Sequence, residues 1–213
     1  PRLWLQMSTA TIYAHRFDAA NDDDTGIIGG NEPDVPDYWG YSIEIAKNWE
    51  AELERADTPD TRKVALRASM IMGPARDGIF DTLYGLTRAR LGGSIAGGRQ
   101  YVSWIHEEDF IAALDHIRES PQLTGPIIVA SPNPLPQAEF MRGLREAMGI
   151  RIGLPATAWM AAIGAFFMRT DTELILKSRR VVPSRLLADG FTFAHPHWPA
   201  AAKVLVEARR RSP

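Results

Sequence analysis

The first 130 residues alternate between short apolar runs and amphipathic helical patterns, and this alternation constrains the fold more than any other feature. Apolar runs over residues 3–7, 62–69, 101–105 and 124–130 predict strands. Helical periodicity over residues 39–56, 79–91 and 107–119 falls between them, with Ile45, Trp49 and Leu53 as the apolar positions of the first helix. Strands joined by crossover helices pair in parallel, so the pattern predicts an α/β fold with a largely parallel sheet.

The first strand ends on small residues, Ser8, Thr9 and Ala10, and open α/β sheets bind ligands at the carboxyl ends of their strands. Residues 17–37 are rich in Asp, Asn, Gly and Pro and predict a long surface loop. His106 and Asp109 are expected to cap the helix over residues 107–119.

From Pro132 onward the pattern changes to helices separated by Pro and Gly, with a strand only at residues 191–193. We therefore expect two domains, a sheet domain over residues 1–131 and a helical lobe over residues 132–213. The apolar stretch at residues 155–168 is shorter than the ~20 residues of a membrane-spanning helix and predicts a buried or interfacial helix. Trp159, Phe166 and Phe167 are expected to be core of this lobe, or to lie beside a substrate cleft.

Charge and composition exclude several partners. A formal net charge of −2 and a pI near 6.3 give no attraction to nucleic acid or to anionic membranes. The absence of cysteine excludes disulfides and thiolate metal sites, and a cytoplasmic location is expected. The chain begins with Pro1 and no Met, so we expect that its front is processed, cut or incompletely recorded.

No Walker loop, zincin helix or nucleophile elbow is present, and no glycines form a GxGxxG or GxxGxxG pattern. Gly26 and Gly29 come nearest, but they lie in a polar loop and do not follow a strand. Of the five histidines only His195 and His197 are close in sequence, and the proline between them indicates a turn more than a metal site. We expect no metal.

Five ordered segments carry a resemblance to a known family. MSTATIYA at Met7–Ala14 resembles the strand-end motif of the extended short-chain dehydrogenases, and LRASMIMGP at Leu66–Pro74 resembles their later strand and Gly-Pro turn. WIHEEDF at Trp104–Phe110 is similar to a third motif of that family. GPIIVASPNPLPQAEF (125–140) and SRRVVPSRLLADGFTFAHP (178–196) resemble the terminal domain of its epimerase-family proteins, some of them labelled cell-division inhibitors.

This resemblance implies a Rossmann-like sheet that binds NADP or NAD at its edge, and a helical carboxy-terminal lobe over a small or nucleotide-sugar-like substrate. It implies that residue 1 falls just before the family's fifth strand, so that the glycine-rich loop is absent from this chain. The sequence therefore does not decide whether the chain binds the cofactor. The positions that match cofactor contacts are Met7, Ser8, Arg67, Ala68 and Ser69. Alternatively, Arg67, Ala68 and Ser69 form an ordinary strand end and contact no cofactor.

The family's catalytic Tyr-x-x-x-Lys pair is absent, because the same register places Ser42 and Ala46 at those positions. Thr9 matches the hydroxyl that holds a substrate oxygen, or else it satisfies the strand end. Tyr41 is a substitute acid or base, or else a packing residue. Met70 stands where many sugar-modifying members have Asn, which weakens the nucleotide-sugar reading.

Two functions remain open at this point. The first is an NAD(P)-dependent epimerase-like oxidoreductase, and the second is a non-catalytic NADP sensor or partner-binding protein of the same fold. A chain that lacks the first four strands would expose the edge of its strand at residues 3–7, and we expect a homodimer through that edge.

Overall fold

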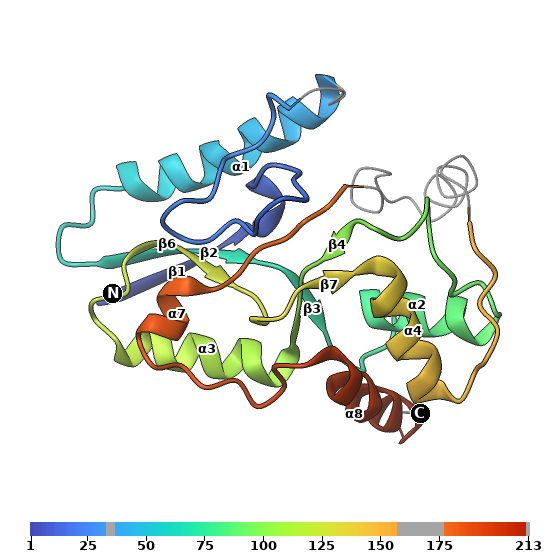
Figure 1. The fold of residues 1–213 in the computed structure, drawn as a ribbon. Helices are drawn as coiled ribbons and strands as arrows, with labels where there is room; N and C mark the ends of the chain where they lie inside the picture. The colour runs from blue at the N-terminus through green and yellow to red at the C-terminus, as the bar shows by residue number, and fades with distance from the viewer. Residues whose placement is uncertain (33–36, 157–176, 212–213) are drawn as a thin grey trace.

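Three parallel strands form the central layer of the computed structural model, which describes residues 1–32, 37–156 and 177–211 (Figure 1). They are β1 (Leu3–Thr9), β2 (Arg62–Ala68) and β6 (Gly125–Val129), in the order β1-β2-β6. The described residues also form two smaller pairs: parallel β3 (Met70–Met72) with β5 (Trp104–His106), and antiparallel β4 (Tyr101–Val102) with β7 (Leu135–Pro136). The predicted α/β fold with parallel pairing is confirmed.

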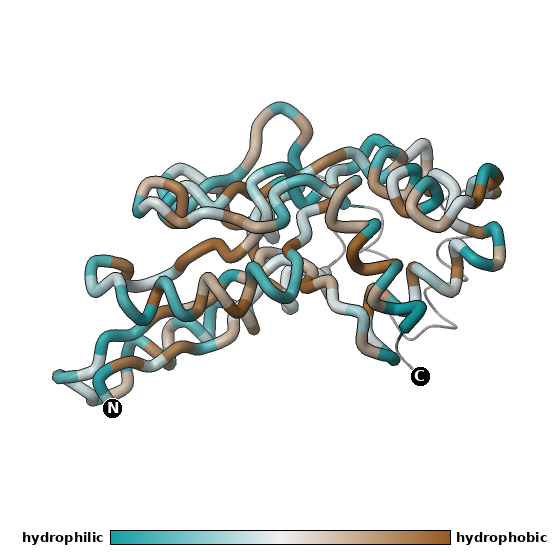
Figure 2. The backbone as a smooth tube through the Cα atoms, turned by 90° about the horizontal axis from the view of Figure 1, so that it is seen from below, coloured by the Kyte–Doolittle hydropathy of each residue, from teal (hydrophilic) through white to brown (hydrophobic). Residues whose placement is uncertain are grey.

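The helices lie on both faces of this sheet and beyond one end of it (Figure 1). They are η1 (Ala10–Ile12), α1 (Asp37–Arg55), α2 (Ile79–Arg88), α3 (Glu107–Glu119), α4 (Gln137–Met148), α7 (Ser184–Ala188) and α8 (Trp198–Arg211). Along the tube in Figure 2, hydrophobic and hydrophilic segments alternate from turn to turn of the helices, as expected where one helix face lies on a core.

Alternate residues of β6 point into two different cores, because successive side chains of a strand face opposite sides of the sheet. Ile127 and Val129 pack with α3, whereas Ile128 packs with α1. A strand that is apolar on both faces needs a helix on each side. This is the physical reason that residues 125–130 contain no polar side chain.

A third core joins α2, α4 and α8 beside β3 and β5. Trp198 stacks on Phe140 at 3.9 Å between ring centroids, and its indole N–H donates to the Phe140 carbonyl at 2.7 Å. Both side chains are buried, together with Phe80 of α2. The core of α4 and α8 thus includes a helix that precedes residue 131. The domain boundary at that position stays a prediction.

Several predicted boundaries are corrected by contacts that are distant in sequence. The strand expected over residues 101–105 is divided at Ser103, whose hydroxyl donates to the Arg179 carbonyl at 2.7 Å and accepts the Val181 N–H at 3.0 Å. Residues 191–193 are not a strand: Phe191 and Phe193 form an edge-to-face pair that packs into the α3 core. The short strands β3 and β7 were not predicted.

The buried face of α1 also differs from the prediction. Trp39, Ile43, Ala46 and Leu53 are buried, whereas Trp49 is 51% exposed. Of the predicted positions, Leu53 is buried, Ile45 is partly buried and Trp49 faces outward. The buried stripe runs through positions 39, 43, 46, 50 and 53, at spacings of three and four residues.

Of the two predicted caps of α3, one is confirmed. His106 accepts the Glu108 N–H through Nδ1 at 3.2 Å. Asp109 does not cap the helix, because its two carboxylate oxygens accept the N–H groups of Ala194 and His195 at 2.7 and 2.9 Å. Asp109 therefore anchors the segment that leads into α8.

Candidate functional site

The residues predicted from two distant segments meet at the carboxyl ends of β1 and β2. In the parallel register Thr9 lies opposite Ala68, and Ser8 lies opposite Arg67. Met7 lies opposite Leu66 one step earlier. This is the edge of an open α/β sheet where ligands bind.

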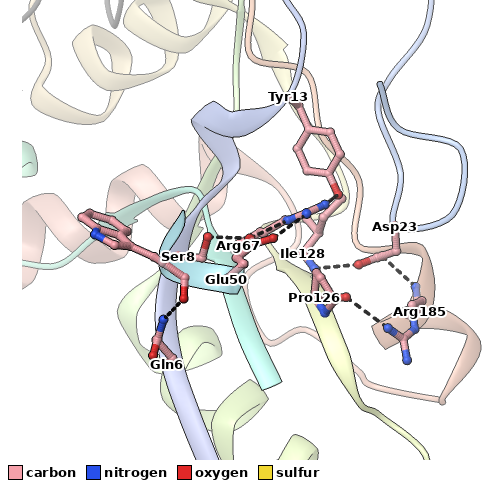
Figure 3. A network of polar contacts seen from close by, with 10 residues as sticks. Gln6, Ser8, Tyr13, Asp23, Glu50, Arg67, Pro126, Ile128 and Arg185 are labelled. Atoms are coloured by element: carbon pink, nitrogen blue, oxygen red, sulfur yellow. Dashed lines mark hydrogen bonds and ion pairs between the residues drawn. The ribbon is translucent and has the colours of Figure 1, made fainter. Parts of the chain in front are cut away.

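A polar network ties Ser8 to Arg67 through a residue that was not predicted, Glu50 of α1 (Figure 3). The Ser8 hydroxyl donates to Glu50 Oε1 at 2.6 Å. Arg67 donates to the same carboxylate through Nε at 2.9 Å and Nη2 at 2.7 Å, and through Nη1 to the Tyr13 hydroxyl at 2.9 Å. The Glu50 and Arg67 side chains are each 13% exposed. The paired charges fix α1 against the sheet edge.

The surroundings of Arg67 and Tyr13 shift the pKa values of both side chains. Burial lowers the pKa of Arg67, but the hydrogen bonds to Glu50 and Tyr13 outweigh it and raise the pKa overall, so the guanidinium stays charged. Burial raises the pKa of Tyr13 above its ordinary value, although Arg67 acts in the opposite direction. Tyr13 is thus a poor base at neutral pH, and its role here is to position Arg67.

Thr9 serves the local backbone. Its Oγ1 accepts the Thr11 N–H at 3.1 Å and lies 2.7 Å from the Thr11 hydroxyl, which caps η1. These contacts correspond to the strand-end role, which was one of the two alternatives for Thr9. The Thr9 side chain is partly exposed. Ser69, just past Ala68, is bound to β6 through its N–H and hydroxyl, which donate to the Val129 carbonyl at 3.1 and 3.4 Å.

Met7 and Tyr41 lie away from this network. Met7 is 50% exposed and lines a surface groove of about 520 Å³ with Trp49 and their neighbours (the full lining is Gln6, Met7, Asn48, Trp49 and Glu52). Tyr41 is 70% exposed on α1. Among the described residues no hydrogen bond joins Tyr41 to Thr9, and both roles of Tyr41 stay predictions.

The helix α1 offers no substitute for the missing catalytic pair at the expected positions. Ala46 is buried in the core, and the Lys47 ammonium forms an exposed ion pair with Glu44 at 2.6 Å, one turn back on the same helix. The amine that lowers a tyrosine pKa in the Tyr-x-x-x-Lys arrangement is thus missing at its position, and the neighbouring amine of Lys47 is paired with Glu44.

Two acidic residues of this region were missed by the sequence reasoning. Glu50 occupies a position of the buried stripe of α1, between Ala46 and Leu53, and a charged residue at a core position was the signal that could have found it. Asp23, in the loop after β1, accepts the Ile128 N–H at 2.6 Å and the Ser184 hydroxyl and Arg185 N–H at 3.0 Å each (Figure 3). No local pattern marks this residue.

The glycine pair in that loop does not form a phosphate cradle. A Cβ on Gly26 would meet the Tyr13 ring at 2.5 Å, and one on Gly29 would meet the Glu32 carboxylate at 2.8 Å. The Gly30 N–H already donates to Glu32 at 2.6 Å. Gly26 and Gly29 allow close packing under the loop. The Gly30 amide, which could otherwise bind a phosphate, donates to the Glu32 carboxylate.

Three aromatic residues proposed for the lobe, Trp159, Phe166 and Phe167, lie outside the described residues, as does most of the apolar stretch at residues 155–168. Met70, at the position of the family's Asn, is partly buried against the α2–α4–α8 core. In the part of the chain that the structure describes, no helix has the length and apolar character needed to cross a membrane.

Comparisons with known proteins agree with this fold. Residues 156–205 match a family model described as "Domain of unknown function (DUF1731)". The human epimerase family protein SDR39U1 is 28% identical over 206 residues, which are 97% of this chain and 66% of that protein. The epimerase family protein Mb2239 of Mycobacterium bovis is 32% identical over 158 residues, covering 73% of this chain and 51% of the relative. The chain thus spans between half and two thirds of these relatives.

Solved structures give the same result. A crystal structure of human SDR39U1 (isoform 2) with NADPH superimposes with a TM-score of 0.81 over 97% of this chain and 66% of that one. A Thermus thermophilus UDP-glucose 4-epimerase in complex with NAD superimposes with a TM-score of 0.71 at 16% identity, over the whole of this chain and 65% of that one. At that identity the second likeness concerns the fold alone.

Proposed function

Because this chain belongs to the extended short-chain dehydrogenase/reductase superfamily, with its epimerase-family proteins, we propose that it contributes the nicotinamide and substrate side of an NAD(P)-dependent epimerase-like oxidoreductase. The observation that carries the proposal is the register of β1 and β2, which brings Thr9 beside Ala68 and Ser8 beside Arg67 at the ligand-binding edge of the sheet. The NADPH in the superimposable human structure supports NADP as the cofactor, with NAD as the alternative.

The residues of this chain fit one end of such a cofactor. The side chains of Thr9, Ala68 and Ser69 at the strand ends are small, which suits the approach of a flat ring, and the Arg67–Glu50 ion pair ties β2 to α1. The pyrophosphate end needs backbone amides at a glycine-rich turn, and the described residues offer no such turn. When bound, the nicotinamide would supply hydride transfer, while Thr9 would hold a substrate oxygen.

The substrate in this proposal is a small or nucleotide-sugar-like molecule with an oxidisable hydroxyl. A threonine hydroxyl can orient that group but does not remove its proton at neutral pH, so the acid or base is the open part of the mechanism. Tyr41 is the proposed substitute. A cytoplasmic location is part of the same proposal and rests on the absence of cysteine.

The missing catalytic pair favours a second candidate, a non-catalytic NADP sensor or partner-binding protein of the same fold. Ser42 and Ala46 carry neither the phenol nor the amine that the chemistry of this superfamily uses. Fold alone does not decide between the two functions.

The first test is titration of NADPH and NADH into the purified chain by fluorescence and calorimetry. We expect NADPH to bind at micromolar affinity, Thr9→Val to weaken binding by about tenfold, and Thr9→Ser, which keeps the hydroxyl, to restore it. Thr82→Val changes an exposed threonine of α2; it is the control and should bind as the wild type does. A folded chain that binds neither nucleotide would contradict the enzyme and the NADP sensor, and would leave the partner-binding protein of the same fold.

Turnover then separates the two candidates. In a substrate screen with NADPH, loss of activity in Tyr41→Phe with cofactor affinity unchanged would support the enzyme and the role of Tyr41. Cofactor binding with no turnover of any substrate class would support the sensor. Turnover that survives in Tyr41→Phe would remove Tyr41 from the mechanism without removing the enzyme.

A further inference from the structure

Two histidines that lie 89 positions apart in sequence meet at the start of α3. The rings of His106 and His195 stack with centroids 3.9 Å apart, and His195 Nε2 lies 2.9 Å from a carboxylate oxygen of Glu108. One ligand atom from each of these three residues lies within 4.8 Å of the others. We propose that His106, Glu108 and His195 form a binding site for a transition-metal ion of the zinc class.

The ligand set selects this class of ion by its chemistry. Two imidazoles and one carboxylate suit Zn²⁺, Co²⁺, Ni²⁺ or Cu²⁺, whereas Mg²⁺ and Ca²⁺ prefer sites made of oxygen ligands. Three protein ligands leave at least one coordination position for water. The sequence predicted no metal, and it set only His195 beside His197; the second imidazole of this cluster comes instead from His106 at the end of β5.

The second observation is an unsatisfied atom. His106 is 2% exposed, and its Nε2 has no hydrogen-bond partner in the described structure. A buried ring nitrogen without a partner is uncommon in folded proteins, and a bound metal ion is one of its explanations. The cap hydrogen bond from the Glu108 N–H to Nδ1 places the ring proton on Nε2 in the metal-free protein.

Metal binding therefore competes with the helix cap. An ion on Nδ1 takes the lone pair that the cap uses, and an ion on Nε2 moves the ring proton to Nδ1, which removes the same lone pair. The cost is that of one helix cap. This is small beside the binding free energy of a metal held by three protein ligands.

The backbone that carries His195 is held in place for this role. The Asp109 carboxylate, 1% exposed, accepts the N–H groups of Ala194 and His195. On the other side, the Pro196 carbonyl accepts hydrogen bonds from the Ser131 hydroxyl and the Asn133 side-chain amide, each at 2.9 Å. Four hydrogen bonds thus hold the backbone of His195 close to the other two ligands before any ion binds. This lowers the entropy that is lost when the site forms.

The ligand atoms need a small closure and a turn of the His195 ring, because an imidazole lone pair lies in the plane of its ring and the two rings are stacked. Two ligands of one zinc ion lie at most about 4 Å apart, since each bond is about 2.0–2.2 Å long. Glu108 is exposed and His195 is partly exposed, so their side chains can rotate the remaining ångström or so. Once closed, the ion would join the first turn of α3 to the segment before α8.

The test is calorimetric titration of ZnCl₂ into the metal-free full chain, with CoCl₂ absorption spectra to report the coordination geometry. We expect one equivalent of Zn²⁺ to bind, no heat with MgCl₂, and a raised thermal midpoint with Zn²⁺. His195→Ala and Glu108→Gln should each weaken Zn²⁺ binding by at least roughly tenfold. His197→Ala, which removes an exposed imidazole two residues away, should bind as the wild type does.

Glu108→Gln guards against a folding artefact, because it changes an exposed side chain and keeps its shape. The proposal is overturned if the wild type binds no Zn²⁺, or if His195→Ala and Glu108→Gln bind it as tightly as the wild type does. Equal weakening in His197→Ala would also overturn it, since the ion would then be held by surface imidazoles in general.

Discussion

Glu50 on α1 accepts two hydrogen bonds from the guanidinium of Arg67 on β2, at 2.9 and 2.7 Å, with each side chain only 13% exposed. A bidentate pair of this kind is among the stronger polar contacts in proteins, and it is shielded here from water. It joins the helix that carries the altered catalytic positions to the strand end where the cofactor residues are proposed.

Removing one member of this pair should be costly. We expect Glu50→Leu to lower the free energy of unfolding by about 3 kcal/mol, because it leaves the Arg67 charge buried without a partner. Urea denaturation measures this change. Glu44→Leu on the same helix, whose ion pair with Lys47 is exposed, is the control and should cost less than about 1 kcal/mol.

A double variant separates the charge effect from packing. Adding Arg67→Met to Glu50→Leu removes the unpaired charge, so the double variant should be more stable than Glu50→Leu alone. If the second substitution only adds to the loss, the buried charge is not the cause and the packing of α1 is.

The contrast between α3 and Glu50 shows what the sequence could predict. The bounds of α3 follow from local signals, namely the helical period, three acidic residues in the first turn and the His106 cap, and the structure has the same bounds. The role of Glu50 depends on Arg67 and Tyr13, 17 and 37 residues away, and no local period encodes those partners.

The same limit applies to the proposed metal site and to the strand that is divided at Ser103. In both, a segment of the carboxy-terminal tail crosses an element formed some 75 to 90 residues earlier. Propensity and periodicity report which side chains face inward, but not which distant segment will meet them.

The Tyr13 hydroxyl should make stability sensitive to alkaline pH. Burial raises its pKa in the folded state above the ordinary value of 10.0, so its favourable contribution is fully present below pH 10 and is lost as the pH rises through the folded pKa. We expect Tyr13→Phe to be less stable than the wild type by about 1 kcal/mol at pH 8, because the Arg67 hydrogen bond is lost. That difference should shrink above pH 10.

Urea denaturation of both proteins at pH 8 and near pH 11 checks this prediction. Other tyrosines and lysines titrate in the same range, but they do so in both proteins and cancel in the difference. A gap between the two proteins that is constant or grows with pH would show that Tyr13 ionises as easily in the folded as in the unfolded chain.

Asp23 should hold the loop after β1 in place. Its carboxylate accepts the backbone N–H of Ile128 on β6, the Ser184 hydroxyl and the Arg185 N–H at the start of α7. Asp23→Ala leaves these donors without a partner, and we expect a loss of about 2–3 kcal/mol. Hydrogen exchange should show the Ile128 amide exchanging faster, whereas Asp18→Ala, which breaks an exposed pair with Arg16, should leave it unchanged.

The outer edge of β1 is predicted to mediate self-association. In the sheet order β1-β2-β6 this strand has β2 on one side. Trp4 and Met7 on it are 37% and 50% exposed, and Met7 lines the groove with Trp49. A strand edge with exposed apolar side chains is a template for pairing with a second copy.

Sedimentation at micromolar concentration should therefore show a dimer, and Met7→Lys should shift it to monomer. Ile111→Lys, at a residue of α3 that is 59% exposed, places the same charge away from the edge and should leave the dimer intact. A wild-type chain that sediments as a monomer would contradict this, and the groove beside Trp49 would then be open to another partner.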